Sequence, residues 1–377
     1  MGFTRFLYEI YKQYNVVINA KPIHNYLHHQ PNSPYFTAKL RDLLHSKYIA
    51  KFVKIPNDTS CNYYSLTFDK TKICVWFSND YDSQPLEVEA VIIQFICMSV
   101  FFLNRFDTNN HERQFEILLI FSPEMKMIPN LQPIHSLKRQ WDRDGNEIVN
   151  VPEWRPLSQN DVNTGVSQFG FDTTSSCIIY RKEEMLKTIL HELIHCYNLD
   201  GSSIDSRDAV VEKKFGINNG KHGRIKATEA TTDAIACLLR IAFQVLDSQP
   251  LGLYDFQMSY KSAVQKGVRH IKQVAQRVTN YMLREHKSKI SPTIWIEETH
   301  VFSYYVLKSW IIHDVIQHLN RCFSGWKEKE KGRGSGSGRK EYEIYDVYGF
   351  LLKNPQLKLL TKNDTHINYS INMLPLF

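Results

Sequence analysis

Three residues, His191, Glu192 and His195, have the types and the spacing for metal-assisted hydrolysis. Positions four residues apart on a helix project from one face about one turn apart, so both imidazoles can bind a single ion. Glu192 follows the first histidine and lies at the edge of that face. A hydrolytic zinc site needs three protein ligands, an open position for water and a base for the proton of that water. The pattern therefore predicts Zn²⁺ bound by His191 and His195, with Glu192 as general base.

The helix that must position these residues is predicted to run from about 181 to 198, and its flanking side chains are apolar. Two histidines and a glutamate are costly to bury in such a helix unless a metal or a polar partner compensates them. The setting therefore favours a metal site over two core histidines. The apolar positions are Met185, Leu186, Ile189, Leu190, Leu193 and Ile194.

A second predicted helix, over about 227–246, carries Glu229 and Asp233 four residues apart, and Glu229 follows His195 by thirty-four residues. This HExxH…ExxxD arrangement resembles the gluzincin metallopeptidases, the thermolysin-like group. The resemblance implies that Glu229 is the third zinc ligand. It also implies that Asp233 hydrogen-bonds the outer nitrogen of His191, which leaves the other nitrogen free for zinc.

An alternative third ligand, His222, lies between the two helices in the segment Asn219–Gly223 (NGKHG). This segment resembles the His-Gly that supplies the last histidine in SprT-like and Spartan-type DNA–protein crosslink proteases. The interval from His195 to His222 is longer than that family favours, and the flanking glycines fit a loop. Glu229 is therefore the preferred ligand and His222 the alternative.

Hydrolysis of a peptide bond also requires a hydrogen-bond donor for the oxyanion of the tetrahedral intermediate. In gluzincins a Tyr or His from a later segment supplies it. Three candidates stand at the start of a predicted helix, namely His300, Tyr304 and Tyr305. The sequence does not rank them, and aromatic residues at a helix start are more often part of a core.

Two predicted strands, Gly165–Phe169 and Cys177–Tyr180, precede the metal-binding helix. In the zincin architecture an edge strand at this place pairs with an extended substrate through main-chain hydrogen bonds. Either strand could serve, so a protein or peptide substrate is expected.

Several short segments together resemble metallopeptidase-like proteins encoded by large DNA viruses. The resemblance covers about residues 85–320, is strongest over 163–236, and implies a zincin fold and a viral setting without a defined substrate. Related sequences often read Glu where this chain has Asp233, and either residue provides a carboxylate. The segments are Asn163–Gly165, Ile178–Glu184, the HELIH motif with Leu199 and Asp200, and Glu229–Asp233.

The wider pattern predicts an α+β protein built from two folded parts. Residues 1–72 read as three short helices followed by a hairpin, which is typical of a winged-helix-like module. Residues 85–326 alternate long helices with short strands and form the expected zincin-like metallopeptidase domain. The charged Gly/Ser-rich stretch 327–340 is predicted to be a flexible loop, and 341–377 a C-terminal extension that packs on the core.

The predicted N-terminal module is basic: residues 1–70 hold nine Lys/Arg against four Asp/Glu. Its hairpin is predicted from Tyr48–Ile55 and Asn62–Phe68, around the turn-forming Pro-Asn-Asp. Winged helices often contact DNA phosphates, but such modules also dock proteins, and this charge excess is a weak electrostatic signal. Nucleic acid is therefore one hypothetical partner. The basic side chains along the predicted third helix and wing are Lys39, Arg41, Lys47, Lys51 and Lys54.

The chain is expected to be intracellular, in host cytoplasm or nucleus or packaged in a virion, and not secreted. Its seven cysteines are scattered singly, which favours a reducing compartment, and its first residues lack the apolar core and cleavage site of a signal peptide. The most apolar run, Ala90–Leu103, is too short to span a bilayer and contains Gln94. A buried core helix is predicted there, and no membrane partner.

Three functions are compatible with these patterns. The first is a zinc metallopeptidase that acts on a viral or host protein. The second is a self-assembling viral structural or occlusion-matrix protein that retains the fold, although a structural site has no need of the base Glu192. The third is a DNA-associated zinc protease, delivered to nucleoprotein by its basic N-terminal module.

Overall fold

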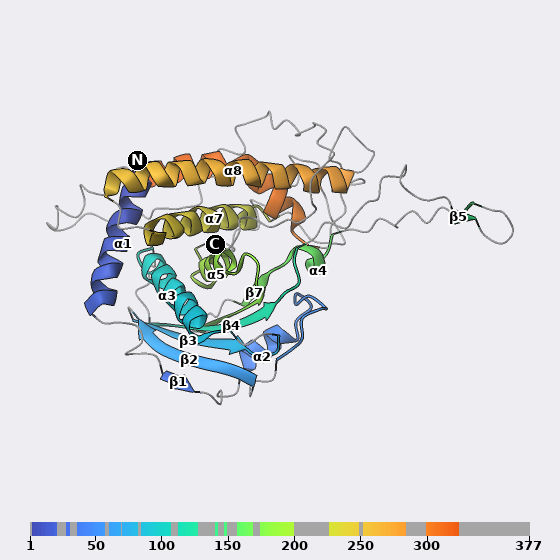
Figure 1. Cartoon of the computed structure of the whole chain (residues 1–377), viewed down its shortest axis with the longest axis horizontal. Helices are drawn as coiled ribbons and strands as arrows, with labels where there is room; N and C mark the ends of the chain where they lie inside the picture. The colour runs from blue at the N-terminus through green and yellow to red at the C-terminus, as the bar shows by residue number, and fades with distance from the viewer. Residues whose placement is uncertain are drawn as a thin grey trace.

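A mixed β-sheet with a thick layer of helices on one face forms the body of the protein (Figure 1). The architecture is α+β, as the sequence predicts. His222 and the segments 327–340 and 341–377 lie outside the described residues. The structure, a computed structural model, describes residues 2–20, 28–30, 36–56, 60–68, 70–81, 84–106, 112–126, 140–141, 147–148, 157–168, 174–199, 226–248, 252–283 and 299–323.

The sheet has the strand order β1-β2-β3-β4-β8-β7. The three central strands β3, β4 and β8 are parallel, whereas β2 and β7 run antiparallel to their neighbours. Both faces of the parallel strands are covered, so their sequences are nearly continuous apolar runs such as FEILLIF. The strands are β1 (His28–Gln30), β2 (Cys61–Phe68), β3 (Thr71–Ser78), β4 (Arg113–Ser122), β7 (Gly165–Gln168) and β8 (Thr174–Arg181), with a separate pair β5 (Gln140–Trp141) and β6 (Glu147–Ile148).

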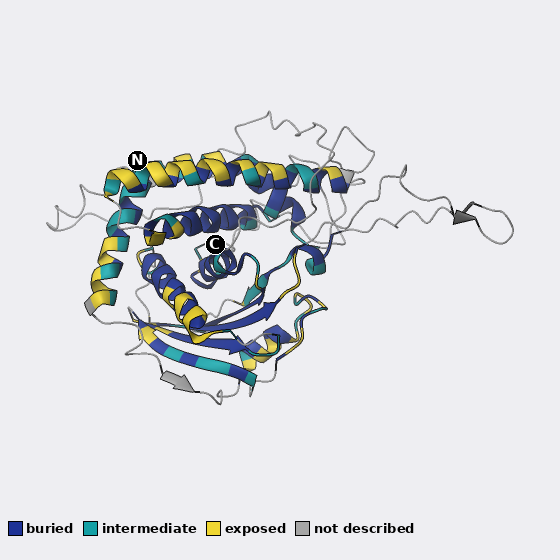
Figure 2. Ribbon diagram, viewed as in Figure 1, coloured by how far each residue is buried: buried dark blue, intermediate teal, exposed yellow. Residues whose placement is uncertain are grey.

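The helix α5 (Met185–Cys196) lies in the middle of the molecule, between the sheet and the long helix α7 (Ala227–Ser248). Figure 2 shows both helices almost entirely buried, while α8 keeps an exposed outer face. These helices meet in one large apolar core. The other described helices are α1 (Gly2–Ala20), α2 (Ala38–Leu44), α3 (Leu86–Leu103), α4 (Gln159–Val162), α8 (Leu253–Leu283), the π-helix Phe302–Leu307 and α9 (Lys308–Cys322).

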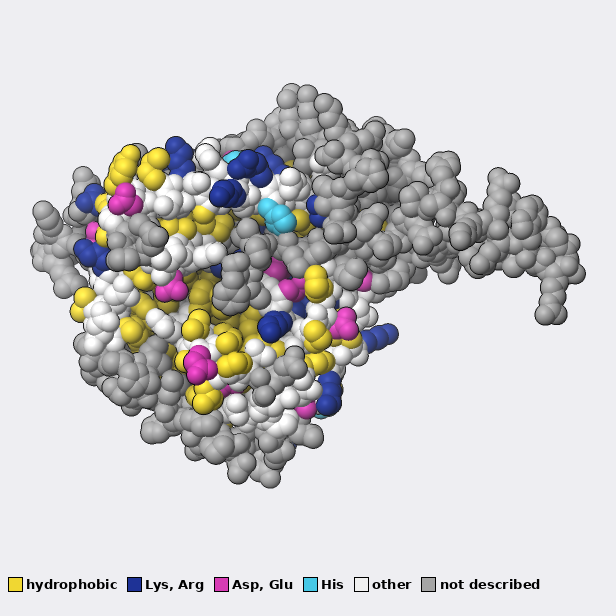
Figure 3. All heavy atoms as spheres, in the orientation of Figure 1, with side chains coloured by type: hydrophobic (Ala, Val, Ile, Leu, Met, Phe, Trp, Pro, Cys, Tyr) yellow, Lys and Arg dark blue, Asp and Glu magenta, His cyan; other side chains and the backbone are white. Residues whose placement is uncertain are grey.

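Helix α3 connects the parallel strands β3 and β4 and packs against α1 and α5. It is the one helix of the described chain that is long and apolar enough to cross a membrane, and 67% of its residues are buried. Its outer face still exposes Leu86, Val88 and Val91, and apolar side chains gather over α3 on the face shown in Figure 3. The helix serves mainly as a core element, as the sequence predicts.

The hairpin of the first eighty residues differs from the predicted one. Strands Cys61–Phe68 and Thr71–Ser78 pair with each other, in place of Tyr48–Ile55 with Asn62–Phe68. Residues 48–55 form turns instead, and Ala50 and Val53 bury their side chains on the opposite face of the sheet from α5. The connection between the strands is short and lacks the Asn-Gly or Asp-Gly pair that marks such hairpins.

Described residues among the first seventy share one sheet and both apolar clusters with the rest of the described chain. β2 and β3 continue into β4 and β8, so the boundary predicted at residue 72 falls inside a hairpin. Helix α1 packs against α3, α8 and α9, and the ring of Phe6 stacks on that of Phe323 with centroids 4.3 Å apart. The pairing of β3 with the distant strand β4 therefore places these residues in the main sheet, in place of the separate module of helices and hairpin that the local pattern predicts.

Candidate metal centre

Strand β8 delivers the chain directly into α5, and Arg181 fixes this junction. Its guanidinium is fully buried and donates to the backbone oxygens of Asn163 at 2.7 Å and Glu124 at 2.9 Å, and also to that of Asn160. Glu184 then takes a left-handed backbone conformation, with a φ of 57°, immediately before the helix. The start of α5 is thereby tied to the ends of β4 and β7.

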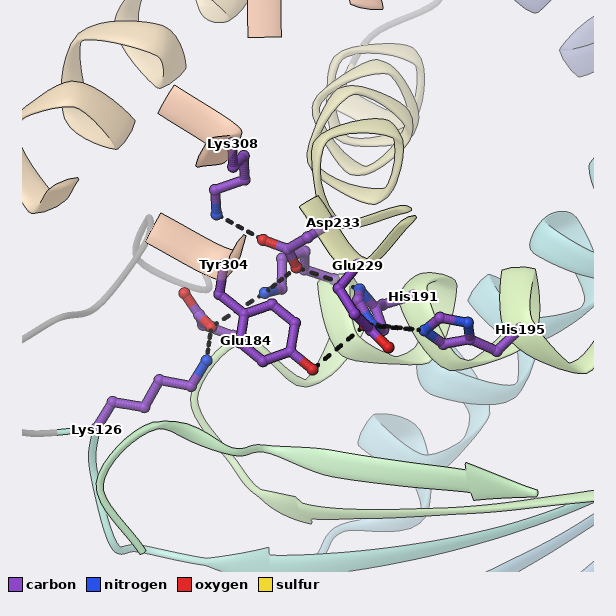
Figure 4. Close-up of polar contacts among 9 residues, drawn as sticks. Lys126, Glu184, His191, His195, Glu229, Asp233, Tyr304 and Lys308 are labelled. Atoms are coloured by element: carbon purple, nitrogen blue, oxygen red, sulfur yellow. Dashed lines mark hydrogen bonds and ion pairs between the residues drawn. The ribbon is translucent and has the colours of Figure 1, made fainter. Parts of the chain in front are cut away.

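The three predicted ligands converge (Figure 4). The Nε2 atoms of His191 and His195 lie 2.9 Å apart, and each is 3.2 Å from Oε2 of Glu229 on α7. Donor atoms around a tetrahedral zinc, at about 2.0–2.1 Å from the ion, are separated by about 3.3 Å. Two imidazoles and a carboxylate in this arrangement therefore fit Zn²⁺.

The ligands sit at the edge of the core. His191 is 5% exposed, while the side chains of His195 and Glu229 are 16% and 17% exposed. One side of the candidate centre is thus accessible from outside the core. A catalytic zinc requires this kind of opening for water and substrate.

Glu192 lies beside the candidate centre, in the wall of a cavity that also includes Gly165 and Thr188. A Cβ atom on Gly165 would stand 3.1 Å from Oε1 of Glu192 and 2.8 Å from Cγ2 of Thr188. Only glycine leaves the present space between β7 and α5. The carboxylate of Glu192 therefore fits against the edge strand because position 165 has no side chain.

Asp233 lies behind His191, with its Oδ1 3.3 Å from the outer nitrogen Nδ1 of the imidazole. The direction of this contact falls short of a hydrogen bond, but the carboxylate occupies the place implied by the gluzincin resemblance. Burial acts to raise the pKa of Asp233, yet Lys187 and Lys308 outweigh it and hold that pKa well below its usual value. Asp233 is therefore anionic where it faces the imidazole.

Sequence reasoning missed a buried chain of alternating charges around Asp233, here called the charge ladder: Lys126, Glu184, Lys187, Asp233 and Lys308 (Figure 4). Lys187 Nζ is 2.7 Å from Oδ1 of Asp233, and Lys308 Nζ is 2.5 Å from Oδ2. Glu184 bridges Lys187 at 3.4 Å and Lys126 at 2.7 Å.

One member of the charge ladder, Lys187, could have been predicted from the sequence to lie near the candidate site. Lys187 stands four residues before His191, and so on the same helix face. Lysine is ordinarily read as a solvent-exposed residue, which hides such a position. Lys126 and Lys308 gave no local signal.

The structure separates the three candidates for oxyanion donor. Tyr304 donates its phenolic hydrogen to Oε2 of Glu229 at 3.3 Å, and its ring centroid lies 5.9 Å from that of His191. The ring of His300 is one step further away, with its centroid 6.2 Å from that of Tyr304. The hydroxyl of Tyr305 is buried and has no hydrogen-bond partner among the described residues. Tyr304 is thus the candidate in contact with a ligand.

Tyr304 belongs to a π-helix, Phe302–Leu307, that precedes α9. Such irregular turns are frequent at functional sites, because they aim side chains that a regular helix would point elsewhere. The π-helix is tied to the start of α7 by the backbone nitrogen of Lys226, which donates to the hydroxyl of Ser303 at 3.1 Å. This bond holds Tyr304 and Glu229 on neighbouring elements.

The predicted nucleic-acid contacts lie on the opposite side of the sheet from α5. Lys39 Nζ donates to the backbone oxygen of Thr174, and Lys54 pairs with Asp80 at 3.5 Å. The ammonium groups of Lys39 and Lys54, and that of Lys47 over the ring of Tyr48, therefore contact this chain itself.

The geometry assembles the predicted ligands, base and positioning carboxylate at one place, with Tyr304 beside them. Comparison with known proteins does not extend this description of the site. No family model, no curated protein and no solved structure matches the chain.

Proposed function

We propose that this protein is a zinc-dependent metallopeptidase of the gluzincin type, with a zincin-like fold. The observation that carries the proposal is the convergence of His191, His195 and Glu229 from two helices onto one position, with Glu192 adjacent. A site that only stabilised the fold would need neither an accessible side nor a neighbouring carboxylate base. The viral setting and the protein substrate implied by the resemblance belong to the same proposal.

Each residue has a distinct task in this proposal. Zinc, when bound, polarises the substrate carbonyl and lowers the pKa of its water. Glu192 accepts the proton of that water and passes it to the leaving amine. Tyr304 donates a hydrogen bond to the oxyanion, and Asp233 keeps His191 in the orientation that presents Nε2 to the ion.

Strand β7 is the element proposed to hold the substrate. It lies at the edge of the sheet and, among the described strands, pairs only with β8, to which it is antiparallel. An extended peptide can pair with its other side through main-chain hydrogen bonds, which demand no particular side chains. Because Gly165 adjoins Glu192, a peptide on β7 would pass in front of the base.

The test combines metal analysis with peptide cleavage on the full-length protein. Glu192→Gln is expected to retain one zinc per chain and to lose cleavage, whereas Glu229→Ala is expected to lose zinc. Glu87→Gln, on the exposed start of α3, is the matched control for a glutamate change and should retain both. Unchanged zinc in Glu229→Ala would transfer the third ligand to another residue such as His222. A wild-type protein that holds no zinc and cleaves nothing would refute the proposal.

A further inference from the structure

A cavity lies on the side of His191 and Glu192 that faces the charge ladder. Its empty volume is about 400 Å³, including the space at its open side. Lys126, Lys187 and Lys308 all line it, together with the two site residues. The cavity therefore joins the candidate metal centre to three buried ammonium groups.

Among the described members of the ladder, three ammonium groups pair with two carboxylates. Lys126 and Lys187 share Glu184, while Lys187 and Lys308 share Asp233. All five side chains are at most 9% exposed, so water screens the surplus positive charge poorly.

The positive charge that is least compensated within the ladder is that of Lys126. Its Nζ has three hydrogens and, among the described residues, donates only to Glu184. Burial lowers the pKa of Lys126, and Glu184 offsets this only in part. The carboxylate of Glu183 accepts from the backbone N–H of Lys126 and interacts electrostatically with its ammonium group, but burial raises the pKa of Glu183 to about 7 and the residue does not line the cavity. A further negative group beside Lys126 would complete its environment.

Three residues that line the cavity carry hydroxyl groups without a hydrogen-bond partner among the described residues. They are Thr164, Thr188 and Tyr305, and each of these hydroxyl groups is buried. A buried polar group left unpaired destabilises the folded chain. Several donors and a surplus ammonium therefore surround one space, which suits a group rich in acceptor oxygens.

We infer that this cavity is a subsite for a carboxylate of the substrate, carried by the residue next to the bond that is cleaved. The inference rests on the proposed peptidase function, because His191 and Glu192 form part of the same wall. The carboxylate can belong to an Asp or Glu side chain or to the C-terminus of a short peptide. Both supply two oxygens that accept from Lys126, Tyr305 and Thr164.

The first experiment compares cleavage of matched peptides by the zinc-loaded, full-length protein. One set carries Glu, Gln or Leu on either side of the cleaved bond, and a second set ends there with a free or an amidated terminus. We expect kcat/KM at least about tenfold higher for the peptide with the carboxylate, because the neutral analogue leaves the buried donors unpaired. The two sets distinguish a side-chain carboxylate from a terminal one.

Tyr305→Phe is the decisive variant, because it removes only an unpartnered hydroxyl and should leave the fold as stable as before. We expect it to reduce the preference for the carboxylate severalfold, and Thr164→Val to act in the same direction. Tyr180→Phe is the matched control: its hydroxyl is also buried and unpartnered but does not line the cavity. A Tyr305→Phe protein with unchanged selectivity would count against the subsite.

Binding to the Glu192→Gln protein separates this inference from the proposed function. Fluorescence anisotropy of labelled Glu and Gln peptides reports occupancy without cleavage. Tighter binding of the Glu peptide that Tyr305→Phe weakens would support the subsite even if no peptide is cleaved, and only the peptidase proposal would then fail. Cleavage or binding with equal efficiency for charged and neutral peptides would overturn the subsite and leave the peptidase proposal standing.

Discussion

Asp233 and His191 face each other across two helices, with Oδ1 of the carboxylate 3.3 Å from Nδ1 of the imidazole, on the side away from the candidate metal position. The carboxylate is itself held by Lys187 and Lys308, one on each oxygen. The candidate ligand His191 therefore contacts a carboxylate that is itself held by ion pairs in the core.

Asp233→Asn should weaken both the fold and the metal site. The change keeps the size of the side chain but leaves two buried lysines short of a counter-charge, at a cost of about 3–5 kcal/mol in the free energy of unfolding. Zinc affinity should fall by about 10–100-fold, because His191 loses its orienting partner. Urea denaturation of the metal-free protein and competition with a zinc chelator measure the two effects.

The stability loss should be partly reversed in the double variant Asp233→Asn, Lys308→Met, because one uncompensated ammonium is removed with the carboxylate. A double variant no more stable than Asp233→Asn alone would show that the pair is not coupled.

The neighbours Glu183 and Glu184 should give opposite pH dependences. Burial acts to raise the pKa of Glu184, but Lys126 and Lys187 outweigh it and lower the pKa to about 2. Its contribution of about 3 kcal/mol to stability is present above the unfolded pKa near 4.5 and is lost as the pH falls toward 2. Unfolding of the metal-free protein between pH 5 and pH 2 should therefore depend less on pH in Glu184→Gln than in the wild type.

For Glu183, burial raises the pKa to about 7, despite the backbone N–H of Lys126. The unfolded chain ionises near pH 4.5 and the folded one only near 7, so wild-type stability should decline as the pH rises through this interval. Glu183→Gln should remove that decline, and therefore be more stable than the wild type at pH 7. Identical profiles for the two variants would contradict both assignments.

On the proposed mechanism, Tyr304→Phe should lower kcat by about 10²–10³ and retain zinc, because it removes the donor assigned to the oxyanion and none of the candidate ligands. Initial rates at saturating peptide, together with the zinc content of the same preparation, test this. A loss of zinc equal to the loss of rate would instead assign Tyr304 to holding Glu229, whose Oε2 it contacts.

Gly165→Ala should reduce activity by displacing Glu192. The added methyl group would stand 2.8 Å from Thr188 Cγ2 and 3.1 Å from both Glu192 Oε1 and the backbone oxygen of Ile178. Overpacking of this kind costs about 1–3 kcal/mol of stability. Gly252→Ala is the control, because its nearest neighbour, Asp255 Oδ2, is 3.5 Å away. Equal kcat in the two variants would show that the space at Gly165 does not govern the base.

The candidate metal ligands could be found in the sequence because the spacing within each pair of residues is local. Two imidazoles four residues apart are predicted to lie on one face of a helix, and so are a Glu and an Asp four residues apart. Neither prediction requires knowledge of the tertiary structure. The approach of Glu229 to His191 could be predicted only through the gluzincin resemblance, since 38 residues separate them.

Other parts depend on contacts that no local pattern encodes. The pairing of Lys308 with Asp233 joins residues 75 positions apart. The β2–β3 hairpin has a short connection with a positive φ at Lys70, where a glycine or asparagine would have marked the turn. The pairing of β3 with β4 cannot be predicted from either strand alone. The sequence therefore contains no sign that the N-terminal residues join the main sheet, and a separate module was predicted for them.

The charge ladder holds Asp233 against the imidazole of His191 through side chains of the protein alone. Its members pair with one another inside the core, so the position proposed for the cation takes shape as the chain folds. If the proposed function holds, such a protein can accumulate in a zinc-poor environment and become competent on the arrival of the ion, without refolding. The onset of activity would then follow the supply of metal, not the synthesis of the chain.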